Sequence, residues 1–243
     1  MSAPSTPAES PRAETSAGRA RAVRGLYPLL SEGQVPTASM AAAARVFADA
    51  GCRIVQLRLK TAVDSERLRI QREVAAALRG SGATLVIDDR ADLVAILASE
   101  AGPDLGLAYG LHLGQQDLPP AAARRVVGPE PLIGYSTHDL AQVAAAAAEP
   151  VDYLGFGPVF ATASKAHPDP VVGLEGLRLA AARSAWPVVA IGGLDLKTAP
   201  LAIEAGAAAV AIIGALVAGL DLATRAGLAA LAKRAADLQD ALA

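Results

Sequence analysis

The feature that most constrains this chain is a regular alternation of eight short apolar segments with eight segments of helical pattern. The apolar segments are residues 25–30, 53–57, 84–87, 110–113, 132–135, 152–156, 188–191 and 208–213. The helical segments are residues 37–50, 64–78, 91–99, 119–127, 139–148, 174–184, 198–205 and a last one that begins near Asp221. Repeated strand–helix units without a second compositional regime predict an α/β fold, a single-domain (β/α)8 barrel.

The length supports one domain, because 243 residues fit a barrel of roughly 200–250 residues. A doubly wound open sheet is the alternative, but no Gly-rich dinucleotide fingerprint follows the first apolar segment, GLYPLL at 25–30. Residues 1–22 are rich in Ser, Pro, Ala, Glu and Arg and lack the apolar stretch of a secretory signal. We therefore expect a disordered tail over 1–22 and a catalytic barrel over 23–243.

Composition excludes several kinds of partner. The net charge of −2 gives no basic footprint for nucleic acid. The longest apolar run, 207–220, is too short and too rich in glycine to cross a membrane. The only cysteine, Cys52, excludes an internal disulfide and a Cys-rich zinc site, so we expect a buried thiol and a cytoplasmic location. Oligomeric state stays open, a homo-oligomer included.

Two cations follow the second apolar segment. Gln56, Arg58 and Lys60 are alternate residues, so an extended backbone turns their side chains to the same face. In a barrel, chemistry takes place at the carboxyl ends of the strands. An anionic substrate is the functional interpretation, and a solvated basic patch is the alternative.

Carboxylates follow the third and fourth apolar segments. Asp88 and Asp89 come directly after 84–87, and Asp117 lies a few residues beyond 110–113. Oxygen ligands of this kind suit Mg²⁺, which takes one or two carboxylates together with waters and substrate phosphate oxygens. Helix capping by the first two and a turn role for Asp117 are the alternatives.

The fifth segment ends in Ser136, Thr137 and His138, for which capping of the next helix, also open to Asp139, is the favoured interpretation. His112 lies inside an apolar segment, and we expect a core histidine with satisfied hydrogen bonds.

The last three strand ends suit anions. Thr162, Ser164 and Lys165 supply two hydroxyl groups and an ammonium, which fit a phosphate or pyrophosphate oxygen, or else form an ordinary surface loop. Gly192, Gly193 and Gly214 expose backbone amides where barrels commonly hold a phosphate. Tight turns are the alternative for any one glycine.

Seven ordered strings carry a resemblance to a known family. They are VQLRLK (55–60), IDDRADL (87–93), GLHLGQQDLP (110–119), IGYSTHDL (133–140), YLGFGPVFATASK (153–165), VGLEGL (172–177) and PVVAIGGL (187–194). The chain resembles the thiamine-phosphate synthase family from about Gly25 to Leu216. This resemblance implies a transferase that joins hydroxymethylpyrimidine pyrophosphate to thiazole phosphate, with Mg²⁺ as cofactor, giving thiamine phosphate and pyrophosphate.

The resemblance also implies a role for each matching position. Arg58, Lys60, Ser136 and Lys165 would be catalytic, and Asp89 and Asp117 would hold Mg²⁺. Positions that would bind the two small-molecule substrates are Gln56, Arg58, Lys60, Asp88, Ser136, Thr162, Ser164, Lys165, Gly193, Ile213 and Gly214. In the family the pyrophosphate departs, a pyrimidine-methyl carbocation develops, and the thiazole nitrogen attacks it.

Four positions depart from the family's usual residues. Leu59 stands where Glu is usual, Asp88 where Asn is common, Ser164 where Thr is common, and Gly214 where Ser is common. Two other functions stay open, a thiazole tautomerase and a barrel that binds a phosphorylated ligand without catalysis. A tautomerase needs neither Mg²⁺ nor a pyrophosphate clamp, so the retained cations and carboxylates favour the synthase.

Overall fold

Eight parallel strands close into a barrel in the computed structural model, which describes residues 18–101, 107–162 and 169–242. The strands are β1 (Gly25–Ser31), β2 (Ile54–Arg58), β3 (Thr84–Asp88), β4 (Ala108–Leu113), β5 (Leu132–Thr137), β6 (Tyr153–Phe156), β7 (Val188–Ile191) and β8 (Ala209–Ile212). Each strand pairs with the next along the chain, and β8 closes onto β1 with Gly25 opposite Ala209. The predicted (β/α)8 barrel is thus confirmed.

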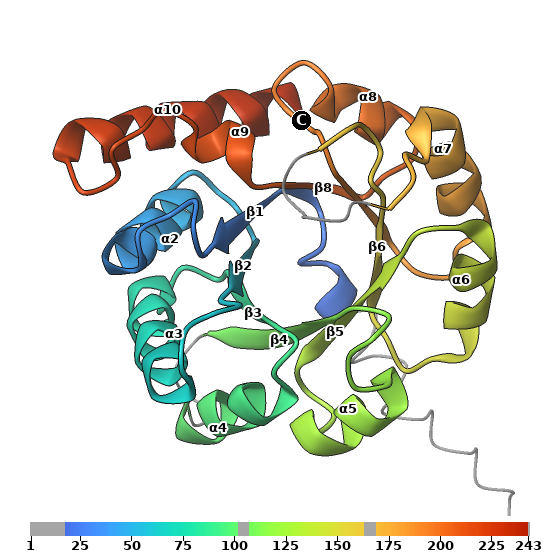
Figure 1. Cartoon of the computed structure of the whole chain (residues 1–243), viewed down its shortest axis with the longest axis horizontal. Coiled ribbons are helices and arrows are strands. Elements are labelled where there is room, and N and C mark those ends of the chain that lie inside the picture. Colours follow the sequence, from blue (N-terminus) through green and yellow to red (C-terminus); the bar gives the residue numbers. More distant parts are fainter. Residues whose placement is uncertain (1–17, 102–106, 163–168, 243) are drawn as a thin grey trace, which may run out of the picture.

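Helices form a ring outside the strands (Figure 1). They are α2 (Met40–Asp49), α3 (Asp64–Leu78), α4 (Ala91–Ala101), α5 (Pro120–Val127), α6 (Leu140–Ala145), α7 (Gly173–Arg183), α8 (Ala199–Glu204), α9 (Gly214–Val217) and α10 (Arg225–Ala241), with 3₁₀ turns η1 (Thr37–Ser39) and η2 (Ala146–Ala148). In the described part of the chain, no helix is both long and apolar enough to span a bilayer.

Three helix starts differ from expectation. Thr37 opens a 3₁₀ turn rather than capping a helix, since Pro36 precedes it and α2 begins three residues later. Asp64 is the first residue of α3, whose N-cap is Val63, and its carboxylate pairs with Arg90 instead. The last helix starts at Arg225, capped by the Thr224 hydroxyl, and the short helix α9 separates it from β8. Of the three candidates to cap the helix after β5, Asp139 is the cap, since its carboxylate accepts from Gln142 N at 2.8 Å. Ser136 and Thr137 bond to His112 and Gly155 O instead.

The core has two layers. The larger one lies between the strands and the helices and is almost entirely aliphatic. It includes Cys52, whose pKa burial raises to about 12, as expected for an inert thiol. The smaller layer fills the barrel interior and contains Tyr27, Val86 and Tyr153. A barrel packed in this way offers space for a ligand only at its two ends.

The amino-terminal end of the barrel is tied by one buried carboxylate. Asp152, 1% exposed, accepts from Ile133 N at 2.8 Å and pairs with both Arg19 and Arg124 at 2.9 Å. Arg19 also donates to Pro129 O at 2.7 Å. Most of the expected tail, residues 1–17, lies outside the described residues, whereas Arg19 belongs to this contact at the base.

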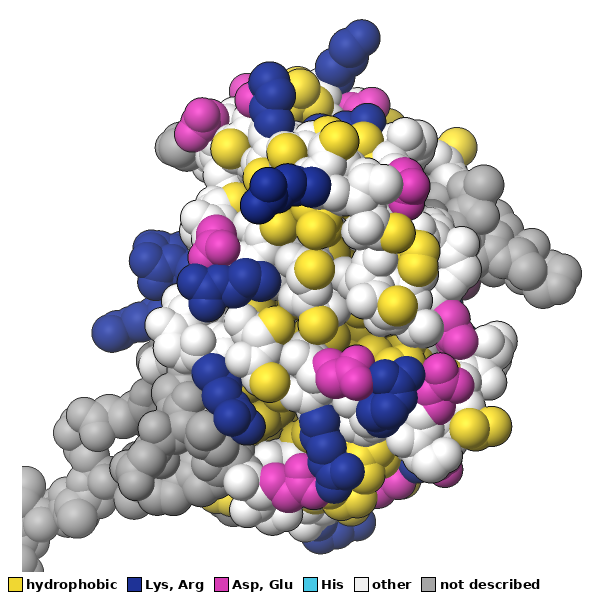
Figure 2. Space-filling model, turned by 90° about the vertical axis from the view of Figure 1, so that its left-hand side faces the viewer, with side chains coloured by type: hydrophobic (Ala, Val, Ile, Leu, Met, Phe, Trp, Pro, Cys, Tyr) yellow, Lys and Arg dark blue, Asp and Glu magenta, His cyan; other side chains and the backbone are white. Residues whose placement is uncertain are grey.

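On the face that carries α2 and α3, acidic and basic side chains are interspersed with single apolar ones (Figure 2). Several of these charges pair on the surface, for example Arg69 with Glu73 at 2.7 Å and Arg45 with Asp49 at 2.8 Å. Exposed pairs of this kind contribute little to stability. Charges of both signs are therefore mixed on this face, and neither sign dominates it.

Candidate active site

A cavity of about 310 Å³ opens at the carboxyl ends of the strands. Of the residues that the sequence nominated, those that line it are Gln56, Arg58, Lys60, Asp88, Asp89, Asp117, Ser136, Thr162, Gly192, Gly193, Ile213 and Gly214. Ser164 and Lys165 lie outside the described residues. The nominated positions that can be observed therefore meet in one place, although they come from seven different strand ends.

The β2 strand supplies one wall by alternation. Gln56, Arg58 and Lys60 face the cavity, whereas Leu57 and Leu59 pack outward in the layer under the helices. Leu59 is only 6% exposed and does not line the cavity. The departure from Glu at this position therefore leaves the cavity wall unchanged and adds to the core.

Asp88 is the most buried charge in the cavity. Its Oδ1 accepts from Gln56 Nε2 at 3.2 Å, and its Oδ2 lies 2.8 Å from Lys60 Nζ and 3.6 Å from Arg58 Nε. Burial raises the pKa of Asp88, and the nearby ammonium of Lys60 opposes that rise. Oδ2 is buried, and its ion pair with Lys60 is its nearest contact with a cation among the described residues.

Lys60 stands between two carboxylates, those of Asp88 and Asp89. Burial lowers the pKa of Lys60, but attraction to Asp88 and its contact with Asp89 outweigh that effect and raise it. The side chain is therefore a stable ammonium. Lys60 therefore places a fixed positive charge at the mouth of the cavity.

Asp89 and Asp117 lie side by side. Burial raises the pKa of Asp117, the Gly114 N–H lowers it, and the neighbouring Asp89 carboxylate raises it again. The contact with Gly114 is a hydrogen bond of 2.7 Å that closes the turn after β4, as the turn alternative predicted. Asp89 has a left-handed backbone, with φ of 63°, which Asp tolerates better than most residues. Among the described contacts, neither the Asp88 nor the Asp89 carboxylate accepts a hydrogen bond from a helix N–H.

The two histidines of this region are tied to the strand ends. His112 bonds through both ring nitrogens, as expected for a satisfied histidine, but it also lines the cavity, which the sequence interpretation missed. His138 Nδ1 donates to Gly157 O at 2.8 Å and lies 3.6 Å from Asp169. Asp169 lines the cavity as well and was not nominated, since it follows no strand directly.

The opposite wall is made by two adjoining loops. After β6 the backbone pairs with the chain after β7, through Val159 N to Ile191 O at 2.9 Å and Phe160 N to Gly192 O at 3.0 Å. Gly193 has φ of 66°, and a Cβ there would lie 2.6 Å from Ala161 O. Only glycine fits so close an approach, which brings Gly193 and Thr162 into the same wall.

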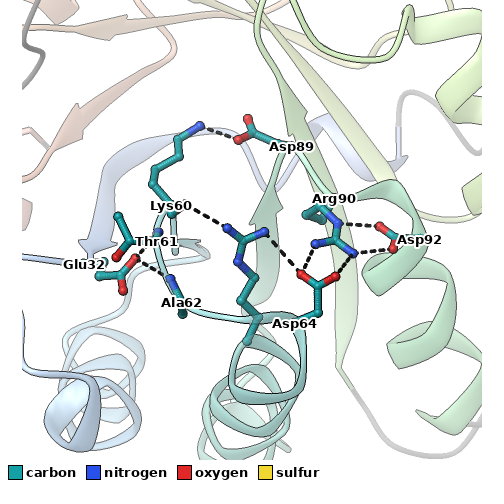
Figure 3. A network of polar contacts seen from close by, with 9 residues as sticks. Glu32, Lys60, Thr61, Ala62, Asp64, Asp89, Arg90 and Asp92 are labelled. Carbon is teal, nitrogen blue, oxygen red and sulfur yellow. Dashed lines mark hydrogen bonds and ion pairs between the residues drawn. The ribbon is translucent and has the colours of Figure 1, made fainter.

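The loop that carries Lys60 is braced from below (Figure 3). Glu32 accepts from Thr61 N at 2.7 Å and Ala62 N at 3.4 Å, and Arg67 Nη2 donates to Lys60 O at 2.8 Å. Arg67 also approaches Asp64 at 3.7 Å, and Arg90 joins Asp64 to Asp92 across the starts of α3 and α4. The backbone around Lys60 is thus held by side chains outside the cavity.

Comparison with known proteins gives one consistent result. A family model described as thiamine monophosphate synthase matches residues 26–216. The thiamine-phosphate synthase of Anaeromyxobacter dehalogenans is 40% identical over 209 residues, which cover 86% of this chain and 87% of that protein. The thiamine-phosphate synthase of Koribacter versatilis is 44% identical over 167 residues, covering 69% and 74%.

Solved structures show the same similarity. A thiamine phosphate pyrophosphorylase from Pyrococcus furiosus superposes with a TM-score of 0.73 at 28% identity, covering 92% of this chain and 96% of that one. A 3-hexulose-6-phosphate synthase has a TM-score of 0.62 at 20% identity, a likeness of fold alone.

Proposed function

Because the chain belongs to the thiamine monophosphate synthase family, we propose that its cavity joins hydroxymethylpyrimidine pyrophosphate to thiazole phosphate. One observation supports this assignment above others. Two cations, Arg58 and Lys60, and two adjacent carboxylates, Asp89 and Asp117, line the same cavity of about 310 Å³. A pyrophosphate with a divalent cation needs both kinds of group, whereas an isomerase acting on a monophosphate needs neither pair.

The proposed reaction breaks one bond and forms another. The bond from the pyrimidine methylene carbon to a pyrophosphate oxygen breaks, and the pyrophosphate leaves with both electrons. The thiazole ring nitrogen supplies its lone pair to the same carbon, which gives thiamine phosphate. Charge grows on the departing oxygens in the transition state, so fixed cations and donors directed at them supply most of the catalysis. Arg58, Lys60 and Ser136 take this role.

The residues present fit Mg²⁺. In the described part of the chain, no three His, Cys, Asp or Glu side chains form a metal cluster. Asp89 and Asp117 are a pair, which suits an ion that completes its shell with water and substrate phosphate oxygens. Mg²⁺, when bound, would neutralise charge on the pyrophosphate. Lys60 holds Asp89 in place meanwhile by its ion pair.

The second substrate is assigned to the opposite wall. Thr162 and the backbone at Gly193 and Gly214 line the cavity there, and hydroxyl and amide groups suit the phosphate of the thiazole. Ile213 supplies an apolar surface at the same strand end. From the family resemblance, Ser164 continues this assignment, whereas Lys165 is assigned to the departing pyrophosphate. The cavity then receives one phosphate-bearing substrate on each wall.

Since Cys52 is the only cysteine and is buried, we assign the reaction to the cytoplasm.

An assay with both phosphorylated substrates tests the proposal directly. The purified protein should release thiamine phosphate and pyrophosphate in equal amounts, and chelation of Mg²⁺ should stop the release. Lys60→Met should lower kcat/KM by about 100-fold, because one fixed charge on the leaving group contributes roughly that much. Lys233→Met is the matched control, since Lys233 pairs with Asp237 on α10 far from the cavity. A folded wild-type protein that forms no product would refute the assignment.

A further inference from the structure

Four side chains form a hydrogen-bonded chain from the cavity into the barrel interior. Ser136 Oγ lies 2.9 Å from His112 Nε2, and His112 Nδ1 lies 2.9 Å from Tyr153 Oη. Tyr153 Oη lies 2.8 Å from Tyr27 Oη. The four residues come from β5, β4, β6 and β1. Only Ser136 and His112 reach the cavity, so the tyrosines act on a ligand through them alone.

The barrel interior is shaped to hold these rings. A Cβ at Gly134 would overlap the ring of Tyr153, and one at Gly155 would lie 3.3 Å from His112 Cε1. The His112 and Tyr153 rings stack with centroids 5.6 Å apart, and Tyr27 meets Tyr153 edge to face at 6.0 Å. Glycines therefore stand at the two interior positions where side chains would displace the chain of hydrogen bonds.

Both tyrosines remain protonated and can donate. Tyr153 is fully buried and Tyr27 is 2% exposed. Burial raises the pKa of each phenol well above its ordinary value. Each hydroxyl group therefore brings one hydrogen, which needs an acceptor inside the barrel.

The Tyr27 hydroxyl, at the inner end of these hydrogen bonds, decides which group donates in each of them. In the described residues, Tyr153 is the only hydrogen-bond partner of the Tyr27 hydroxyl. If Tyr27 donates to Tyr153, then Tyr153 donates to His112 Nδ1 and the imidazole donates from Nε2 to Ser136 Oγ. Every hydrogen inside the barrel then has an acceptor, and only the Ser136 hydroxyl hydrogen is left, facing the cavity. In the reverse direction the Tyr27 hydrogen has no acceptor among the described residues, which costs about 1–3 kcal/mol unless a water fills the cavity of about 30 Å³ beside both tyrosines. The first direction is favoured.

We propose that His112 is a positioning residue that donates from Nε2–H to Ser136 Oγ and so leaves the Ser136 hydroxyl hydrogen for an anionic oxygen in the cavity. Tyr153 and Tyr27 hold the imidazole in that tautomer. In the alternative direction, Ser136 would donate its hydroxyl hydrogen to His112 Nε2, and only the lone pairs of Ser136 Oγ would face the anion. The inference rests on the proposed function only in naming that anion as pyrophosphate.

Nitrogen NMR of the full-length protein tests the direction without any substrate. The chain has three histidines, so loss of one imidazole signal in His112→Gln assigns the ring. We expect a neutral ring that carries its proton on Nε2. Tyr153→Phe removes the donor to Nδ1 and should introduce the other tautomer. A wild-type ring protonated on Nδ1, or on both nitrogens, would overturn the proposal.

A double-mutant cycle tests whether His112 acts through Ser136. Ser136→Ala and His112→Leu should each weaken binding of inorganic pyrophosphate with Mg²⁺ by about tenfold, and the double variant should be no weaker than Ser136→Ala. His112→Gln keeps an N–H donor and should recover part of the lost pyrophosphate affinity. If His112→Leu does not fold, His112→Gln takes its place in the cycle. Losses that multiply to about 100-fold would show an independent role for His112.

These two measurements separate the inference from the proposed function. If the wild type forms no thiamine phosphate, the function fails, while the tautomer and the pyrophosphate cycle still decide the role of His112. If turnover is normal but the ring is protonated on Nδ1, the inference alone fails.

Discussion

At the residue scale, Asp88 places a negative charge beside Arg58 and Lys60, the two cations proposed to bind pyrophosphate. Its Oδ2 lies 2.8 Å from Lys60 Nζ and 3.6 Å from Arg58 Nε. The carboxylate attracts the same cations that a pyrophosphate would need. It also repels the ligand, since two like charges a few ångströms apart at a partly buried site interact by a few kcal/mol.

Asp88→Asn should therefore tighten binding of inorganic pyrophosphate with Mg²⁺ by about tenfold, which equals about 1.4 kcal/mol. The amide oxygen can still accept from Gln56 Nε2, so the geometry is retained. Calorimetric titration measures the affinity, and Asp92→Asn gives the same charge change at an exposed position that does not line the cavity. Weaker binding in Asp88→Asn would instead mean that the carboxylate is needed to hold Lys60 in place.

Residue patterns predicted most of the cavity lining, charged and neutral, but missed Asp169 and the cavity position of His112. The nominated cations and carboxylates follow their strands directly or within a few residues, and those in the described part, Arg58, Lys60, Asp88, Asp89 and Asp117, line the cavity. His112 was interpreted as core because it lies in an apolar strand, and only the distances to Ser136 and Tyr153 reveal its contacts on both sides. Alternation from Gly110 would have placed His112 on an inward face, but not at the cavity floor.

At the scale of elements, the loop between β2 and α3 carries Lys60 and depends on a residue from a different loop. Glu32 follows β1 directly and accepts from two backbone N–H groups of this loop. Glu32 N also donates to Arg58 O at 2.9 Å, which extends the β1–β2 pairing. One half-buried carboxylate thus sets the path of the backbone that carries Lys60.

Glu32→Gln should raise the KM for the pyrimidine pyrophosphate roughly three- to tenfold while the melting temperature falls by less than ~2 °C, because an exposed hydrogen bond contributes little stability. Glu73→Gln is the control, since Glu73 pairs only with Arg69 on the surface among the described residues. Steady-state kinetics and thermal denaturation measure the two effects. An unchanged KM would show that the loop keeps its path without Glu32.

The pH dependence of this contact has a definite sign. The Thr61 N–H holds the pKa of Glu32 below its ordinary value of 4.5. A lowered pKa in the folded state adds stability above the unfolded pKa, and the gain is lost as pH falls through the folded value. The difference in melting temperature between wild type and Glu32→Gln should therefore shrink below about pH 4.5.

Element boundaries were predicted to within two residues, except that α2 and α10 begin three and about four residues later than expected. The 188–191 segment is β7 itself, and the other strands differ by one or two residues at their ends. Strand lengths follow from burial on both faces, which apolar runs record directly. Helix starts depend on which nearby side chain reaches the free N–H groups, and Asp64 pairs with Arg90 in preference to its own helix. The sequence does not show that competition.

At the scale of the whole molecule, stability and function are assigned to opposite ends of the barrel. Asp152 precedes β6 at the amino-terminal end, where it joins Arg19, Arg124 and the start of β5. Asp89 follows β3 at the carboxyl end, inside the cavity. Both are aspartates beside cations, but Asp152 is buried and its partners are structural. Removal of one partner from a buried ion pair leaves the other uncompensated.

Asp152→Asn should lower the free energy of unfolding by about 2–4 kcal/mol, toward the low end of the buried-pair range because both arginines stay partly exposed. Its kcat per folded molecule should stay within about twofold of wild type. Asp89→Asn should do the reverse, with kcat/KM down by about 100-fold and stability within ~0.5 kcal/mol, since Asn also tolerates a left-handed backbone. Denaturant unfolding and turnover, measured on both variants, test the pair. A large loss of turnover in Asp152→Asn would show that the base of the barrel shapes the cavity, because the described contacts of Asp152 include no cavity residue.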